Sequence, residues 1–283
     1  MTIARLPIPV LRPFVAQVWA SDELPAVPSL RPETEHLLPT GMMHLAFRMV
    51  DAPLRVRESP TDAGALLRGA MVGGARSRYF IRELSAPGCS VAAVLRPGAA
   101  QLLFGAGADE LAGRHTPLPD LWGAAADSLR ERLLETPSAE ARLALLEAAL
   151  AARLPRVRGL HPAIAAVLHR MDAALPVAAA VEDSGLSHRR FIAQFRSAVG
   201  LAPKAYLRVQ RFQQALRRLR RGAALASVAA DAGYSDQSHF SREFLEFSGV
   251  TPAAYRRLQP AQANHLLVAA GQISSRRTRA GDG

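Results

Sequence analysis

The sequence predicts an α+β protein in which a mostly β, sensor-like N-terminal domain precedes helices and an all-helical C-terminal domain. Short apolar runs of strand length, separated by Pro and Gly, occupy the first 115 residues. After Pro117 the apolar residues change to helical spacing. A helix-turn-helix pattern then occurs twice in the last third of the chain. These observations predict domains over residues 1–155 and 156–260, followed by a disordered tail over residues 261–283.

In the first domain, three runs have the length and bounding residues of strands. They are Leu45–Val50, Tyr79–Leu84 and Ser90–Leu95. The stretch from Pro53 to Gly74 mixes Pro, Asp, Gly and Arg, so it is expected to include a long loop.

Three helices are expected before the duplicated region. Leu121–Leu134 and Leu143–Leu154 have helical spacing, and Ser138 is expected to cap the second of them. A short linker over residues 154–159 leads to a helix that Pro162 opens and that extends to about Ala174.

The duplication repeats its landmarks at an offset of 49 residues, counted from Phe191 to Phe240. Before the first Phe of each copy, the second copy has one extra residue. The landmarks are Phe191, Phe195, Gly200, Pro203 and Tyr206 in the first copy, and Phe240, Phe244, Gly249, Pro252 and Tyr255 in the second.

In the first unit, Val177–Asp183 is expected to be the supporting helix and Gly185 its turn residue. Ser187 is expected to cap the next helix, whose two Phe residues point into the core. The residues left on its exposed side are His188, Arg189, Arg190, Ala193 and Gln194.

In the second unit, Leu225–Ala232 is expected to be the supporting helix and Gly233 the turn, and either Asp236 or Ser235 caps the next helix. The residues left on its exposed side are Gln237, Ser238, His239, Ser241 and Arg242.

A single helix from Pro203 to Arg221 is expected to join the two units, about 27 Å long at 1.5 Å per residue. Such a spacer can hold two helices near one turn of B-DNA apart, about 34 Å. Its arginines, including Arg220, are expected to face outward toward phosphates.

The charge distribution points to a polyanion. The formal net charge is +11, and residues 160–260 hold 14 Lys and Arg against 7 Asp and Glu, whereas residues 1–159 hold 18 against 16. Because the basic excess lies on the segment with the repeat, DNA is the expected partner. An arginine-rich proteome explains Arg over Lys, but not why the acids are concentrated in the first half.

Each exposed helix face has residues suited to reading base edges. Arg189 is favoured for a bidentate bond to guanine, Arg190 is left open between base and phosphate, and His239 is favoured as a surface residue or phosphate contact. In the second unit, Gln237 can read adenine and Arg242 guanine. The full expected DNA-binding set is Ser187, Arg189, Arg190, Gln194, Ser235, Gln237, Ser238, His239 and Arg242.

Residues 160–258 resemble the DNA-binding domain of AraC/XylS-family transcriptional regulators, most specifically over Val228–Phe244 and Gly249–Arg256. The resemblance implies a seven-helix module whose two recognition helices enter adjacent major-groove segments. Four residues depart from the family pattern, namely Val181, Ala193, Leu245 and Glu246. These departures bear on DNA affinity and not on the fold.

The N-terminal half is similar to an uncharacterised domain found on a branch of these regulators. The matching segments are Leu95–Leu102, Asp109–Leu111 and Pro117–Trp122. Such domains sense an effector or mediate dimerisation, and the resemblance implies no particular ligand.

The alternative is a catalytic or metal-binding N-terminal domain attached to the DNA-binding module. His36, His44 and His115 lack the clustered spacing of a metal site, and no phosphate loop, nucleophile elbow or paired-carboxylate motif occurs. Cys89 is the single cysteine, which excludes an internal disulfide and favours a reducing cytoplasm. We therefore expect no catalytic residues, no cofactor and no bound metal. No membrane span is expected either, because the sequence has no apolar run of 18 residues.

The sequence thus predicts a bacterial, cytoplasmic one-component transcription factor that binds double-stranded promoter DNA. RNA polymerase, a small-molecule effector of unknown identity and a second copy of the chain are its further candidate partners.

Overall fold

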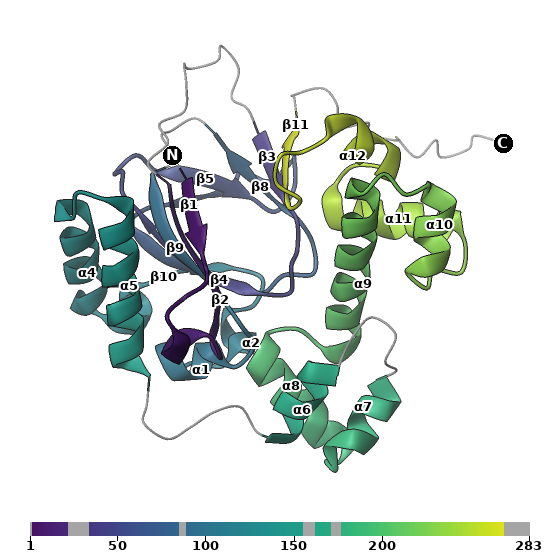
Figure 1. Ribbon diagram of the computed structural model, residues 1–283, viewed down its shortest axis with the longest axis horizontal. Coiled ribbons are helices and arrows are strands. Elements are labelled where there is room, and N and C mark those ends of the chain that lie inside the picture. The colour runs from purple at the N-terminus through teal and green to yellow at the C-terminus, as the bar shows by residue number, and fades with distance from the viewer. Residues whose placement is uncertain (1, 22–33, 85–88, 155–161, 171–176, 269–283) are drawn as a thin grey trace.

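The computed structural model describes residues 2–21, 34–84, 89–154, 162–170 and 177–268. Two antiparallel sheets form the N-terminal domain, helices follow, and a second helical group lies beside the sheets (Figure 1). The predicted α+β class is confirmed. Over these ranges, none of the helices combines the length and apolar character that crossing a membrane requires.

The strands form two sheets that face each other. In sheet A, the order is β1 (Thr2–Arg5), β2 (Val15–Ser21), β9 (Ser90–Leu95), β4 (Met43–Arg48), β7 (Ala70–Gly73) and β10 (His115–Pro117). In sheet B, the order is β11 (His265–Val268), β3 (Thr34–Leu37), β8 (Phe80–Glu83), β5 (Leu54–Arg57) and β6 (Ala65–Leu67).

The three predicted strands correspond to β4, β8 and β9. The stretch from 53 to 74 differs from the expected loop, because it contains β5, β6 and β7 with only a short connection between the first two. These strands are four residues or fewer. Runs this short show little alternation, and they are stabilised by pairing, β5 with β8 and β6, and β7 with β4.

The helices after the sheets begin with α1 (Ala99–Phe104), α2 (Ala108–Leu111) and α3 (Pro119–Trp122), and continue with α4 (Ala124–Glu135) and α5 (Ala139–Arg153). The Ser138 hydroxyl accepts a bond from the Ala141 amide, as a cap should. Helices α4 and α5 cover the outer face of sheet A (Figure 1). A 3-10 turn, η1 (Pro9–Leu11), precedes β2.

The C-terminal helices are α6 (Pro162–Arg170), α7 (Val177–Ser184), α8 (His188–Val199), α9 (Pro203–Arg220), α10 (Leu225–Asp231), α11 (Gln237–Ser248) and α12 (Pro252–Leu258). The expected linker after Leu154, with the boundary near 155, and the expected end of the helix after Arg170 lie outside the described residues.

The segment after α12 departs from the disordered tail expected from residue 261. Strand β11, at His265–Val268, pairs with β3 at the edge of sheet B. Leu266 and Val268 are buried in the process. A strand this short gains its stability from the sheet that it joins, so composition alone does not reveal it. Residues 269–283 lie outside the described part of the chain.

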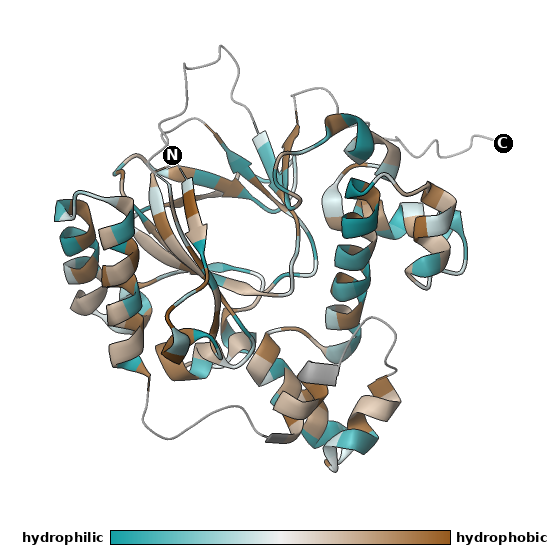
Figure 2. Cartoon of the chain, viewed as in Figure 1, coloured by the Kyte–Doolittle hydropathy of each residue, from teal (hydrophilic) through white to brown (hydrophobic). Residues whose placement is uncertain are grey.

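One hydrophobic cluster extends through both halves of the molecule, from the outer face of sheet A to the interior of the helical group. Leu45, Leu146, Phe191 and Tyr255 all belong to it. Helix α9 is mainly hydrophilic along its length, apart from its buried face (Figure 2). The N-terminal domain and the helical domain therefore share packing.

Candidate nucleic-acid interface

Helices α8 and α11 are matched in length and in their start. Each has 12 residues, and the start of α8 at His188 and of α11 at Gln237 are 49 residues apart, like the repeated landmarks. The Ser187 hydroxyl accepts from the Arg190 amide at 3.4 Å, and an Asp236 carboxylate oxygen accepts from the His239 amide at 2.7 Å. The cap of the second helix is therefore Asp236, which decides between the two residues that the sequence left open.

Both helices also end in the same way. Gly200 and Gly249 adopt left-handed backbone conformations, with φ of 87° and 74°, directly after the last helical residue. Glycine reaches this region without the steric cost of a side chain. The duplicated sequence therefore specifies two helical units that each begin with a side-chain cap and end with a left-handed glycine.

The predicted aromatic residues form the interior of each unit. Phe191 and Phe195 are fully buried in the first, as are Phe240 and Phe244 in the second. From α9, the Phe212 ring lies 5.2 Å from the Phe244 ring, between centroids. The connecting helix is thus part of the core of the second unit.

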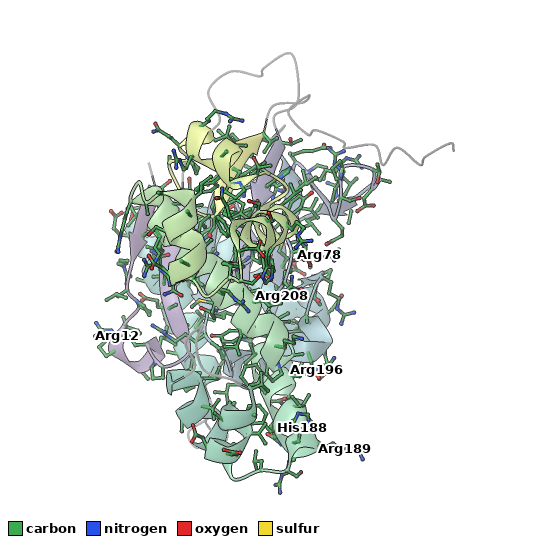
Figure 3. The ribbon with its side chains drawn as sticks, turned by 90° about the vertical axis from the view of Figure 1, so that its right-hand side faces the viewer. Arg12, Arg78, His188, Arg189, Arg196 and Arg208 are labelled. Carbon is green, nitrogen blue, oxygen red and sulfur yellow. The ribbon has the colours of Figure 1, made fainter. Side chains whose placement is uncertain are left out.

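Most of the predicted DNA-binding side chains are exposed at the beginning of the two helices. The exposed ones are Ser187, Arg189, Arg190 and Gln194 in the first unit, and Ser235, Gln237, Ser238 and Arg242 in the second. His188 and Arg189 lie at the free end of the first unit (Figure 3). Because the Phe residues occupy the opposite face of each helix, these polar groups remain available to a partner.

His239 differs from the others, because it is half-buried at the start of α11. Its Nδ1 lies 3.1 Å from the Ser235 hydroxyl, and its ring meets the Tyr234 ring edge-on at 5.3 Å. The Ser235 hydroxyl also donates to Asp236. The pKa of Asp236 is lowered by the His239 amide and by Ser235, so this carboxylate stays ionised as a cap.

Several of the α9 arginines bind within the protein. Arg211 donates to the carbonyl oxygen of Gly233, Arg218 forms an ion pair with Asp231, and Arg220 donates to the carbonyl oxygen of Ala261. These contacts hold α10 and the segment before β11 against α9. The expectation that these arginines point outward toward phosphates is therefore wrong for these three side chains. Backbone carbonyl groups and Asp231 of α10 lie within their reach and bind them instead.

An ion-pair network that includes the buried Glu243 joins α9 to α11. Arg208 Nε donates to a Glu243 oxygen at 2.8 Å, and Arg208 Nη2 donates to a Glu246 oxygen at 2.7 Å. Arg78 of the N-terminal domain lies 3.4 Å from the other Glu246 oxygen. The sequence indicated Glu246 only as a departure from the family pattern that bears on DNA affinity, because nothing in the local spacing places it opposite Arg208.

The N-terminal domain contacts α8 and α11 at equivalent places, near their C-terminal ends. The Gly98 amide donates to the carbonyl oxygen of Ala198 at 2.8 Å, and His36 Nδ1 lies 2.9 Å from the carbonyl oxygen of Ser248. Both contacts leave the exposed N-terminal residues of the two helices free. The N-terminal domain therefore touches both units at once, on the side away from the candidate interface.

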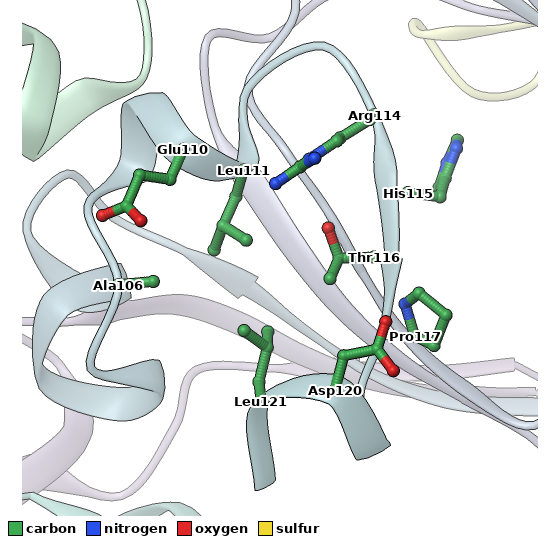
Figure 4. Close-up of a pocket in the computed structure, with 9 residues that line it drawn as sticks. All are labelled: Ala106, Glu110, Leu111, Arg114, His115, Thr116, Pro117, Asp120 and Leu121. Atoms are coloured by element: carbon green, nitrogen blue, oxygen red, sulfur yellow. The ribbon is translucent and has the colours of Figure 1, made fainter.

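A pocket of about 310 Å³ lies in the N-terminal domain beside α2, the helix that packs on α8. Arg114, Glu110, Asp120 and Thr116 are among its lining residues (Figure 4). The Thr116 hydroxyl is buried and has no hydrogen-bond partner among the described residues. Helix α2 therefore forms one wall of this pocket and also contacts α8 of the first unit.

Comparison with known proteins gives matches to both parts of the chain. A family model described as a helix-turn-helix domain matches residues 180–258, and one described as a domain of unknown function, DUF6597, matches residues 4–117. A protein of Streptomyces lividans described as an AraC-like transcription regulator is 37% identical over 92 residues, and one of Streptomyces antibioticus is 35% identical over 92 residues. Each alignment covers 32% of this chain and 30% of the relative, so the chain spans about a third of these relatives.

Among solved structures, the C-terminal domain of AraT, a response regulator from Geobacillus stearothermophilus, has 22% identity and a TM-score of 0.33, covering 35% of this chain and 86% of that one. ToxT from Vibrio cholerae has 9% identity and a TM-score of 0.45, covering 92% of this chain and 99% of that one. The repeated helices, the family model and the Streptomyces relatives agree on one assignment. The C-terminal part of this chain is an AraC-type helix-turn-helix domain, and it follows an N-terminal domain of the uncharacterised family DUF6597.

Proposed function

We propose that this protein is a transcription regulator that binds double-stranded promoter DNA through α8 and α11. The observation that carries the proposal is the pairing of these helices, since each is capped by a side chain and has its polar residues exposed at the N-terminal end. Helix α9 has 18 residues and is about 27 Å long, which suits two helices in neighbouring major-groove segments.

The residues divide between two roles. Arg189 and Arg242, exposed on α8 and α11, bond guanine edges, and Gln237 bonds adenine. Ser187 and Ser235 lie beside the helix N-termini, where backbone amides favour a phosphate. His239 supports the start of α11 rather than entering the groove, because its ring is held by Ser235 and Tyr234.

The N-terminal domain modulates this binding through its contacts with both helices. His36 and Gly98 touch α11 and α8 respectively, so a change within the sheets alters how the two units are held. A small-molecule effector is the agent of that change, RNA polymerase is the downstream partner, and the protein acts in the cytoplasm. A second copy of the chain is a further candidate partner.

Selection from a random DNA library with the full chain, followed by hydroxyl-radical footprinting, tests the proposal. Two protected segments about 10 base pairs apart on one face of the duplex are expected. Protection confined to a single groove segment would contradict it.

Arg242→Ala in α11 is expected to lose discrimination at one base position by about 1–3 kcal/mol, measured by competition between the selected site and its single-base variants. Arg189→Ala should do the same at a position about one turn away. Arg12→Ala is the matched control, because Arg12 is exposed on the N-terminal domain, away from α8 and α11 (Figure 3). If Arg242→Ala weakened selected and random DNA equally, direct reading of a base by Arg242 would be wrong.

A further inference from the structure

Arg78 extends from the N-terminal domain to the side of α11. It belongs to the segment between β7 and β8, and its side chain is 72% exposed. Its Nη2 lies 3.4 Å from a Glu246 oxygen of α11. A contact this long between solvated groups contributes little to stability, so stability alone does not account for an arginine at this place.

The segment that contains Arg78 is held against α11 by the next residue, Tyr79. The Tyr79 ring stacks on the His36 ring at 4.5 Å between centroids, and His36 Nδ1 lies 2.9 Å from the carbonyl oxygen of Ser248. A Cβ at Gly249, directly after α11, would lie 2.6 Å from the Tyr79 ring. The backbone of Arg78 is therefore fixed near the C-terminal end of α11, whereas its side chain reaches past these contacts into solvent.

Glu246, the neighbour of Arg78, lies on the same side of α11 as Arg242. The two α11 residues are four apart, and residues at this spacing are neighbours on a helix surface. Arg242 is exposed and is one of the side chains proposed above to bond a base. A recognition helix contacts bases with its N-terminal residues, whereas its C-terminal end is the part that can contact the DNA backbone. Arg78 thus lies at the end of α11 where phosphates are expected.

The two recognition helices differ in charge at this end. Arg196 is exposed in the third turn of α8, and the residue 49 positions later, in α11, is Leu245. Leu245 and Glu246 supply no positive charge, so α11 lacks among its own residues the cation that α8 has here. Arg78 and Arg196 lie on the same side of the molecule, away from Arg12 (Figure 3). Arg78 therefore provides, from the N-terminal domain, a cation at the corresponding place beside α11.

The charges around Glu246 show why this cation matters for a polyanion. Glu243 and Glu246 both accept from Arg208, at 2.8 Å and 2.7 Å. Two carboxylates share one guanidinium, so one negative charge beside α11 is uncompensated until Arg78 is counted. An uncompensated carboxylate at this place would repel a DNA strand.

Arg78 has donors to spare for a further acceptor. A guanidinium has five N–H donors. Within the part of the chain that the structure describes, Arg78 bonds only Glu246, and only through Nη2. Its Nε and Nη1 are therefore available to an acceptor that approaches from solvent.

We propose that Arg78 binds a DNA phosphate beside the groove segment that α11 occupies, so that the N-terminal domain forms part of the DNA interface. Nε and Nη1 donate to the phosphate, while Nη2 stays beside Glu246 and offsets its charge. A phosphate contact strengthens binding to every sequence alike and does not choose between bases. The inference rests on the DNA-binding function proposed above and adds a contact that the helix-turn-helix domain alone does not supply.

Equilibrium DNA binding by the full chain tests this contact. The selected duplex and a random duplex of the same length are each titrated by fluorescence anisotropy at several sodium chloride concentrations. Arg78→Met is expected to weaken binding to both duplexes by the same factor, about five- to ten-fold near 0.1 M salt. The slope of log K against log salt concentration should become less steep by about 0.9, because one phosphate fewer is neutralised.

Two further variants serve as controls. Arg12→Met removes the same charge from an exposed arginine on the other side of the molecule, so affinity and slope should stay as in the unmodified chain (Figure 3). Arg78→Lys keeps a cation that can bind phosphate as a point charge, so it should keep the slope of the unmodified chain. An unchanged slope in Arg78→Met, or an equal change in Arg12→Met, would overturn the proposal.

A double-mutant cycle with Glu246→Gln separates a phosphate contact from mere neutralisation of Glu246. Glu246→Gln alone should strengthen binding to both duplexes, because it removes a carboxylate that repels the strand. If Arg78 only offset that carboxylate, Arg78→Met would have no effect in the Glu246→Gln chain. A direct contact predicts that the change in slope of about 0.9 persists there. Its disappearance in this background would overturn the phosphate contact.

The unmodified chain separates this inference from the function on which it rests. If that chain bound neither duplex, the proposed function would be wrong, and the contact by Arg78 would be wrong with it. If it bound the selected duplex and Arg78→Met changed neither affinity nor slope, only the contact by Arg78 would be wrong.

Discussion

Gly249→Ala is expected to destabilise the protein by about 2–5 kcal/mol, because two costs coincide at this position. Its φ of 74° disfavours any residue with a side chain. A Cβ there would also lie 2.6 Å from the Tyr79 ring and 2.8 Å from the His36 ring. Those two rings are stacked at 4.5 Å, and His36 is completely buried, so neither can move aside without loosening the contact with α11. Urea unfolding of the full chain measures the difference.

Gly233→Ala provides the control. Its φ is also 74°, but a Cβ there meets nothing within 4 Å. It should therefore cost only the backbone term, about 1–2 kcal/mol. Equal losses for the two variants would show that a Cβ at position 249 is accommodated beside His36 and Tyr79 without cost, contrary to the prediction.

Arg208→Met is expected to cost on the order of 3 kcal/mol, because it leaves the Glu243 carboxylate buried without its cation. Glu243 is 5% exposed, and the Arg208 guanidinium is its charged partner at 2.8 Å. In a double-mutant cycle, adding Glu243→Gln should recover part of the loss, since the buried group is then neutral. Urea unfolding of the four chains gives the coupling free energy.

Arg218→Met is the matched control on the same helix. Its ion pair with Asp231 lies at the surface, with side chains 38% and 42% exposed. Solvent screens such a pair, so the expected loss is about 0–1 kcal/mol. A loss for Arg208→Met no larger than this, or no recovery in the double variant, would mean that the buried pair does not hold α11 against α9.

The helical half followed from the sequence because its signals are local. Ser187, Gly185 and Gly200 each act within a few residues of their own position, and the repeat supplies a second copy of each signal. The local signals do not decide between Asp236 and Ser235, since both can cap a helix and only the backbone geometry separates them.

The sheet half was less predictable, for a physical reason. Strands β5, β6 and β7 are too short to show alternation, and β11 consists of four residues in what was expected to be a disordered tail. β5, β7 and β11 are stabilised by hydrogen bonds to partner strands distant in the chain, and β6 depends in turn on β5. The strand propensity of a short segment does not include the stabilisation that it gains from these partner strands.

The amino-acid sequence by itself determined that this chain contains two matched helix-turn-helix units with exposed polar residues at the start of each second helix. Periodicity, caps and glycine turns suffice for that, because they act over a few residues. Only the tertiary structure decided that Arg208 neutralises Glu243, that Arg78 lies beside Glu246, and that His265 reaches Glu35. Such pairs depend on which distant segments fold together, and charge interactions follow distance in space rather than separation along the chain.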